Sequence, residues 1–314
     1  MFTLRQYLLA LLDSRGLTRT LGEIDVCRDE QGRPCFSAGN SAAVFRIRLG
    51  GRIRSLRCYL RPMRHLKEIY GQRLLEKELY LHTSPETGVW VDTVLGDWIE
   101  GSTLHETVAQ AAALRDRESL QILVRLFDRL ALALVTDDRA HGDLKPENII
   151  VGDDGTLCPI DFDASYLPAF AGEISPELGT AAYQHPARTA ADFDERIDDY
   201  PAALISTALH ALAEDPTLWD RYGSSDGLLY TPQRIASDPA YRETLALFEK
   251  RGMAVQYRIA QLLTAPTLRL FGLAELLAEA VREKPAVRSG TEAETPELFV
   301  ENGRWGYRLS LIHI

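Results

Sequence analysis

The stretch that decides the fold runs from residue 141 to 148, HGDLKPEN, and is followed at 160–163 by IDFD. Within it, Asp143 and Asn148 share one short loop, with Lys145 between them, and Asp161 follows the next strand-like segment. Phosphoryl transfer from a nucleotide needs a carboxylate to orient a hydroxyl, a cation for the γ-phosphate and oxygen ligands for magnesium. These two short stretches offer all three.

The residue types predict a role for each position. We expect Asp143 to receive the proton of the attacking hydroxyl and Lys145 to neutralise the transferring phosphate. Asn148 and Asp161 carry the amide and carboxylate oxygens that Mg²⁺ prefers, so they are the predicted metal ligands.

These motifs resemble those of the eukaryotic-like protein kinase superfamily, whose catalytic loop reads HRDLKPEN and whose metal loop reads DFG. Residues 179–187, GTAAYQHPA, are similar to the GTxxYxAPE end of that family's activation segment. After them, Asp199 opens an apolar helix where the family places an aspartate that braces the catalytic loop. The neighbouring Asp198 is interpreted as an exposed carboxylate in the first turn of that helix.

The resemblance implies an α+β, bilobal, protein-kinase-like fold with ATP and Mg²⁺ as cofactors. We expect a small β-rich N-lobe with one main helix and a larger, mainly α C-lobe. The predicted domains are an N-terminal helical extension (1–24), the N-lobe (25–100), the C-lobe (101–282), a linker (283–297), a possible truncated WG repeat (298–308) and a tail (309–314).

Hydrophobic periodicity supports this division. Residues 3–14 read as a short helix, and 28–34, 36–48, 53–59 and 89–99 as strand-like segments rich in turns. Helical spacing of apolar residues between 65 and 80 predicts the main N-lobe helix. Further helices are predicted over 120–135, 202–213, 240–263 and 273–281.

The N-terminal half matches the family less closely. Residues 37–44, SAGNSAAV, can be aligned with GxGxxGxV, which makes Gly39 and Val44 candidate nucleotide contacts. Arg57 stands where the family has a phosphate-pairing lysine, and Glu76 is the candidate helix glutamate that pairs with it, with Glu78 as the competing choice. The backbones of two further residues, in a stretch that resembles the hinge, are expected to meet adenine: Asp97 and Ile99.

Three departures from the family bear on activity. Arg57 keeps the positive charge but presents a planar fork in place of a compact ammonium. Gly142 replaces the arginine that grips a phosphorylated activation loop in many family members, so switching by phosphorylation near Thr180 is not favoured. Asp163 replaces the metal-loop glycine, which makes that loop stiffer.

Composition excludes several function classes. The net charge of −10 argues against nucleic acid as the main partner, because such binding depends on clustered Lys and Arg. The four cysteines form no CxxC pair, so neither zinc nor a disulfide framework is indicated, and reduced thiols in a cytoplasmic protein are expected. No secretory signal and no apolar run long enough to span a bilayer is found in the sequence, so no membrane association is expected.

The last residues have a separate character. Residues 298–307, LFVENGRWGY, resemble the start of a WG repeat, a short β-rich module; a lone turn-bearing strand is the alternative. The final six residues, LSLIHI, resemble a translated sequencing adapter and are left out of the fold prediction. If further repeats followed in the full gene, protein partners would be expected to bind through them.

Three functions are compatible with these observations. The first is a Ser/Thr-type protein kinase that binds ATP and acts on a protein substrate. The second is a pseudokinase, a binding or scaffold module, which Arg57, Asp163 and the single loop glycine favour. The third is a small-molecule kinase of the aminoglycoside or choline type, which Gly142 favours and the LKPEN continuation opposes.

Overall fold

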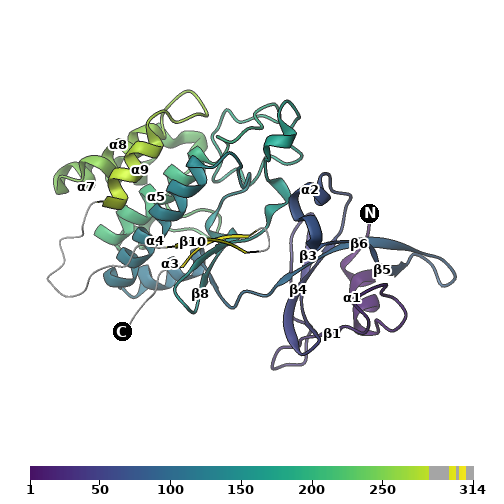
Figure 1. The fold of residues 1–314 in the computed structure, drawn as a ribbon. Helices are drawn as coiled ribbons and strands as arrows, with labels where there is room; N and C mark the ends of the chain where they lie inside the picture. Colours follow the sequence, from purple (N-terminus) through teal and green to yellow (C-terminus); the bar gives the residue numbers. More distant parts are fainter. Residues whose placement is uncertain (283–296, 302–303, 309–314) are drawn as a thin grey trace. The chain divides into compact units, whose positions relative to one another are not determined.

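The computed structural model describes residues 1–282 with their side chains and the backbone of residues 297–301 and 304–308. The chain forms two compact units, one of residues 1–99 and one from residue 100 onward. The first holds a curled antiparallel sheet, and helices make up most of the second (Figure 1). The expected α+β class is therefore confirmed.

The first unit is built on six antiparallel strands, in the order β1-β3-β4-β6-β5, with β2 paired to β3. One helix precedes the sheet, and a short helix and a 3₁₀ turn precede β5. The elements are α1 (Leu4–Leu12), β1 (Asp25–Val26), β2 (Phe36–Ala38), β3 (Ala42–Leu49), β4 (Arg52–Tyr59), α2 (Leu66–Tyr70), η1 (Gly71–Arg73), β5 (Leu74–His82) and β6 (Gly88–Asp97).

One face of this sheet forms the core of the first unit. Ala43, Phe45 and Ile47 of β3 are fully buried and alternate with more exposed neighbours, because successive side chains of a strand point to opposite faces. Tyr7 and Leu11 of α1 belong to the same buried cluster. The helix predicted over residues 3–14 is therefore confirmed, and it completes the core of this unit.

The main helix predicted between residues 65 and 80 is wrong. Helix α2 ends at Tyr70, since Gly71 follows with a φ of 53°, and the chain then continues as strand β5. Leu79 and Leu81 are buried while Tyr80 and His82 are not, which is the period of a strand. The helical spacing in the sequence therefore applied to a single short helix.

The second unit combines a smaller antiparallel sheet with helices. Its sheet order is β10-β11-β9-β8-β7. The elements are β7 (Gly101–Thr103), α3 (Leu104–Ala113), α4 (Arg117–Thr136), η2 (Pro146–Asn148), β8 (Ile149–Gly152), β9 (Leu157–Pro159), η3 (Phe162–Ala164), η4 (Pro168–Phe170), α5 (Asp199–Glu214), α6 (Leu218–Tyr222), η5 (Pro232–Ser237), α7 (Pro239–Arg251), α8 (Ala254–Leu262), α9 (Leu273–Arg282), β10 (Glu297–Glu301) and β11 (Arg304–Arg308).

Helix α5 is the centre of this unit. Nearly all of its side chains are buried, which is the pattern of a helix surrounded by others, and α4 and α9 pack in the same cluster (Figure 1). The helices predicted over 120–135, 202–213 and 273–281 are confirmed. The helix predicted over 240–263 is two helices, because Gly252 adopts a left-handed φ of 69° after α7. Among the described residues, no helix is both long and apolar enough to cross a membrane.

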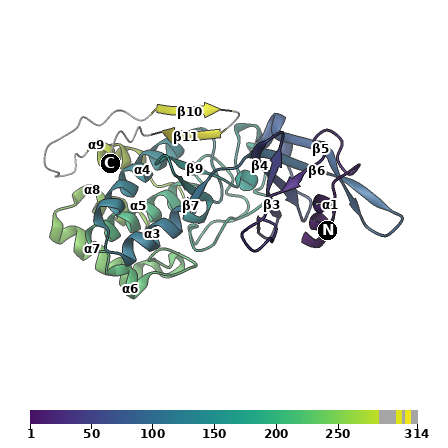
Figure 2. The same cartoon turned by 90° about the horizontal axis from the view of Figure 1, so that it is seen from below.

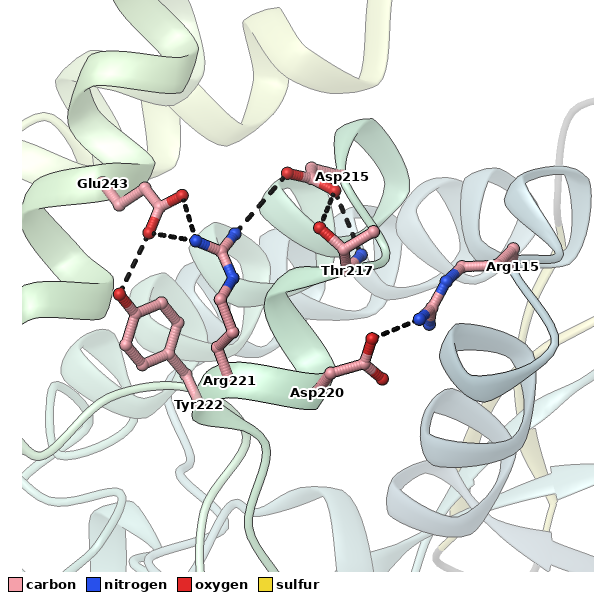
Figure 3. Close-up of polar contacts among 7 residues, drawn as sticks. All are labelled: Arg115, Asp215, Thr217, Asp220, Arg221, Tyr222 and Glu243. Atoms are coloured by element: carbon pink, nitrogen blue, oxygen red, sulfur yellow. Dashed lines mark hydrogen bonds and ion pairs between the residues drawn. The ribbon is translucent and has the colours of Figure 1, made fainter.

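A polar network holds α6 against its neighbours (Figure 3). Arg221 Nη1 lies 2.7 and 2.9 Å from the two carboxylate oxygens of Glu243 on α7, and Tyr222 Oη donates to the same carboxylate at 3.0 Å. On the other side, Asp220 pairs with Arg115, which lies between α3 and α4. Exposed ion pairs of this kind each contribute little to stability, so we assign the network to the orientation of α6.

The C-terminal strands extend the sheet of the second unit. The backbones of β10 and β11 form a hairpin, and Tyr307 of β11 is in register with Leu157 of β9 (Figure 2). The predicted WG repeat falls on this hairpin, whose side chains and residues 302–303 lie outside the described residues, so the repeat stays a prediction. The predicted linker, apart from residue 297, and the predicted tail over 309–314 also lie outside them.

A buried polar contact between α4 and α5 gives a test of this packing. Asp128 accepts hydrogen bonds from Ser206 Oγ at 2.6 Å and from His210 Nε2 at 2.8 Å. Asp128→Ala leaves both donors without their acceptor, so we expect the free energy of unfolding to fall by about 2–4 kcal/mol. Urea denaturation followed by circular dichroism measures the change.

Asp128→Asn keeps one acceptor oxygen and should cost less than the alanine variant. Exposed Asp153, changed to Ala, serves as the control. A loss below about 0.5 kcal/mol for Asp128→Ala, the range of ordinary surface substitutions, would show that this contact does not hold the two helices together.

Candidate active site

Asp143 lies at the centre of a polar cluster in the second unit. Thr180 N donates to its Oδ1 at 2.5 Å, and Asn148 Nδ2 donates to its Oδ2 at 3.3 Å. Lys145 Nζ lies 3.5 Å from the same Oδ2 and donates to Thr180 Oγ1 at 2.8 Å. The structure thus brings together three predicted site residues and adds Thr180. The sequence placed Thr180 in a segment motif but carried no sign that it contacts Asp143.

The local chain explains why these side chains face the same way. Leu144 is fully buried, so its neighbours Asp143 and Lys145 point away from the core, with 16% and 23% of their side chains exposed. Pro146 then begins the 3₁₀ turn η2, in which Asn148 N donates to Lys145 O at 2.9 Å. This turn brings Asn148 back to the carboxylate of Asp143.

Asn148 and Asp161 lie at the same end of the β8–β9 ladder. Asn148 precedes β8 directly, and Ile160 N, just before Asp161, donates to Asn148 O at 2.8 Å. Asn148 Nδ2 also donates to Asp143 O at 2.9 Å, so its Oδ1 is the amide atom left for a cation. An amide oxygen and a carboxylate are donors that suit Mg²⁺.

The predicted metal ligands, Asn148 and Asp161, would need further ligands from outside the protein. In the described part of the chain, no three or more His, Cys, Asp or Glu side chains form a group that could hold a metal ion. Asp161 is followed in the turn η3 by Asp163, which is only 2% exposed. Mg²⁺ commonly binds through one or two protein groups together with water and phosphate oxygens, so the donor set fits it.

The carboxylate that braces the catalytic loop is Asp198, and the assignment of that role to Asp199 was wrong. Asp198 has no exposed surface, although the sequence analysis interpreted it as exposed, and it accepts hydrogen bonds from His141 N and from Gly142 N at 3.0 Å. Asp199 instead accepts one from Leu270 N at 3.1 Å. Successive residues at the start of a helix point about 100° apart, so the two carboxylates serve different segments.

Gly142 is required by the backbone of the loop. Its φ is 80°, and a Cβ at this position would lie 2.0 Å from the carbonyl oxygen of Ala164. An arginine, which the family has at this position, does not fit this backbone. The departure from the family is therefore tied to the close approach of the segment that follows Asp161.

In the first unit, Val44 and Arg57 lie on adjacent strands of the sheet, and Gly39 lies in a turn beside it. Gly39 begins the turn between β2 and β3, and its N donates to Ala42 O at 2.9 Å. Val44 of β3 is in register with Arg57 of β4. Arg57 is partly buried, with its guanidinium carbon 5.9 Å from the ring centroid of Tyr59.

Glu76 does not have the setting predicted for it. It lies on β5 instead of a helix, and its carboxylate is largely exposed, 3.8 Å from Lys67 Nζ. Glu78, the competing choice, is buried and accepts hydrogen bonds from the backbone N of residues 19–21 at 2.8–3.1 Å. The helix that suggested a partner for Arg57 is absent, and Glu78 ties the N-terminal segment to the sheet.

Asp97 and Ile99 lie at the end of the first unit. Asp97 is the last residue of β6, and Ile99 the last residue of the unit. Asp97 Oδ1 is 2.7 Å from Arg54 Nη1, and Asp97 O accepts a hydrogen bond from Ser55 Oγ at 3.0 Å.

Comparisons with known proteins support a kinase-like relationship. No family model matches the chain. It is 28% identical over 213 residues to the serine/threonine-protein kinase PknL of Mycobacterium tuberculosis, covering 64% of this chain and 52% of PknL. It is also 28% identical over 172 residues to the CBL-interacting protein kinase 17 of Oryza sativa subsp. japonica, covering 52% and 35%.

The chain thus spans about half and about a third of the lengths of these two curated relatives. Identity at this level indicates distant homology with Ser/Thr protein kinases and supports a place in the protein-kinase-like superfamily.

The buried carboxyl group of Asp199 should make the free energy of unfolding depend on pH. Burial raises the pKa of Asp199 to about 7 from an ordinary value of 3.8, although the hydrogen bond from Leu270 opposes the rise. The folded protein holds this proton more tightly than the unfolded chain does. The resulting stability is therefore complete below pH 3.8 and is lost as the pH rises to about 7.

Asp199→Asn removes this titration. We expect the unfolding free energy of the variant, relative to the wild type, to increase by about 2–4 kcal/mol from roughly pH 4 to pH 7. Urea denaturation at several pH values across this range measures it, with Asp153→Asn as an exposed control. A difference that stays constant with pH would contradict the assignment.

Proposed function

We propose that this chain is an ATP- and Mg²⁺-dependent phosphotransferase, a Ser/Thr-type protein kinase that transfers the γ-phosphate to a protein hydroxyl. The observation that carries the proposal is the convergence of Lys145, Asn148 and Thr180 on the carboxylate of Asp143. The distant homology with Ser/Thr protein kinases supports the same class of reaction.

Asp143 is the base of the proposed reaction. Both of its oxygens are engaged by neighbouring groups, so the carboxylate is held in one orientation and presents a fixed acceptor to a hydroxyl proton. Lys145 places a positive charge next to it, where negative charge on the transferring phosphate would be neutralised. When bound, Mg-ATP supplies the phosphoryl group and further positive charge.

The remaining contacts are proposed by residue type and position. Asn148 and Asp161 would hold Mg²⁺, since the two residues lie at one end of the β8–β9 ladder and carry an amide and a carboxylate oxygen. In the first unit, the proposed nucleotide contacts are Gly39, Val44, Arg57, Asp97 and Ile99. Glu76 is left out, because the helix on which its role depended is a strand.

A protein substrate is favoured over a small molecule by Thr180. The segment that carries it is bonded to both Asp143 and Lys145, so a substrate hydroxyl that reaches the base must pass next to this segment. The small-molecule alternative draws support from Gly142, because such kinases also have the sequence HGD at this position. Gly142 has the left-handed backbone that glycine favours. The pseudokinase alternative draws support from Arg57.

The first test is Asp143→Asn. Because the amide cannot accept the hydroxyl proton, we expect transfer of labelled phosphate from Mg-ATP, to the protein itself or to casein, to fall by about 10²–10⁴-fold. Exposed Asp153→Asn, on the turn between β8 and β9, is the matched control and should keep wild-type activity.

Three results would overturn the protein kinase proposal. Activity of Asp143→Asn near the wild-type level would remove Asp143 as the base. Thermal stabilisation by Mg-ATP without turnover in the wild type would indicate a pseudokinase. Turnover only with added small alcohols or aminoglycosides would indicate a small-molecule kinase.

A second test concerns Arg57, opposite Val44 in the sheet. Arg57→Lys replaces a planar fork with a compact ammonium, the form that the family uses for phosphate pairing. If Arg57 contacts phosphate, we expect KM for ATP to change by about tenfold or more, with a gain in kcat if the arginine limits the reaction. Unchanged kcat and KM would show that another group makes the phosphate contact.

A further inference from the structure

Arg188 lies against the catalytic loop, although nothing in its sequence motif assigns it a role. Arg188 comes shortly after Thr180 in the chain, and only 9% of the residue is exposed. Arg188 Nη1 donates to Gly142 O at 3.0 Å and also to Gln184 Oε1. The carbonyl that it holds belongs to the residue directly before Asp143.

A contribution to the stability of the fold does not by itself explain why the guanidinium of Arg188 is buried. Arg188 Nε and Nη2 have no hydrogen-bond partner within the described residues, and burial lowers the pKa of Arg188. The negative charges of Asp198 and Asp143 oppose that lowering, so the guanidinium interacts electrostatically with both the brace and the proposed base. A buried charge that is only partly paired usually costs stability.

The side chain that donates to the Gly142 carbonyl cannot belong to position 142 itself. A side chain at position 142 is excluded by the φ of 80° and by the carbonyl of Ala164. The segment before Arg188 lies very close to the carbonyl of Gly142. A Cβ at Gly179 would lie 2.7 Å from Gly142 O and 2.8 Å from Gln184 Nε2. Residues 179–188 are therefore placed to bring a donor to the loop.

The peptide groups of Gly142 are held from two sides by charged side chains. Asp198, at the start of α5, accepts from Gly142 N at 3.0 Å, and Arg188 donates to Gly142 O at 3.0 Å. Charge-assisted hydrogen bonds are about twice as strong as neutral ones, so this arrangement restrains the rotation of the peptide that leads into Asp143.

We propose that Arg188 is a positioning residue for Asp143, which acts by holding the Gly142 carbonyl while Asp198 holds the amide of the same residue. The inference rests on the proposed function, in which Asp143 is the base. Arg188 itself contacts neither substrate nor nucleotide in this proposal. It keeps the base within reach of the hydroxyl, and a displacement of about 1 Å at such a site can lower the rate by about 10²-fold.

The test compares Arg188→Met and Arg188→Lys with Arg196→Met in the full chain. Arg196 is a matched control, because it also donates to a backbone carbonyl, that of Val135 at 2.6 Å, which belongs to α4 and not to residues 141–148. For Arg188→Met we expect kcat to fall by about 10²-fold with KM for ATP changed less than about threefold. Arg188→Lys keeps a donor and a charge and should recover about tenfold of the loss.

Arg196→Met should lose stability but keep kcat within about threefold of the wild type. A purely structural role for Arg188 would give the two methionine variants similar kcat values once both are assayed below their unfolding transitions. That result, or no recovery of kcat by Arg188→Lys, would overturn the proposal while leaving the proposed function in place.

A second measurement does not depend on activity. Amide hydrogen exchange of the peptide covering residues 140–146 reports directly on the catalytic loop. We expect exchange to be about tenfold faster in Arg188→Met than in Arg196→Met at matched temperature below unfolding. Equal exchange in the two variants would overturn the positioning role even if the wild type transferred no phosphate, an outcome that would count separately against the proposed function.

Discussion

The second unit depends on one buried carboxylate, that of Asp198. It has no exposed surface and accepts the backbone amides of His141 and Gly142, so the start of α5 and the catalytic loop are joined directly. Burial raises the pKa of Asp198, while the nearby His141, the two amide hydrogen bonds and the guanidinium of Arg188 oppose the rise. A buried carboxylate needs such donors, and a loop without regular structure needs such an acceptor.

The polar groups that hold Asp143 and the residues directly before it come from three separate segments. The catalytic loop supplies Asp143 and Lys145, the segment after it supplies Thr180 and Arg188, and α5 supplies the brace. Because the contacts of Thr180, Arg188 and Asp198 join the loop to the other two segments, the orientation of Asp143 depends on tertiary packing as well as on the loop itself. Groups held in this way need little rearrangement when a substrate arrives, which is the physical basis for electrostatic preorganisation.

In the first unit too, a buried carboxylate joins two segments by accepting backbone amides, and here it belongs to Glu78. Glu78 of β5 is buried and accepts the backbone amides of residues 19–21, while α1 packs on the sheet through Tyr7. The N-terminal segment is therefore part of the compact unit. Where the family resemblance implied a main helix, this chain has strand β5. The buried glutamate of that strand, Glu78, joins the N-terminal segment to the sheet. Val44 and Arg57, both predicted as nucleotide contacts, are in register on adjacent strands.

The α+β class could be predicted from the sequence, and so could the grouping of Asp143, Lys145 and Asn148, because these three residues lie on one short loop that the covalent chain keeps together. The choice between Asp198 and Asp199, and between a helix and a strand at Glu76, depends on tertiary packing. Adjacent positions are alike in sequence, but packing against distant segments buries one side chain toward the loop and turns the next about 100° away. The contacts of Thr180 and Arg188 could not be predicted from the sequence for the same reason. Long-range packing brings these residues to Asp143 and Gly142.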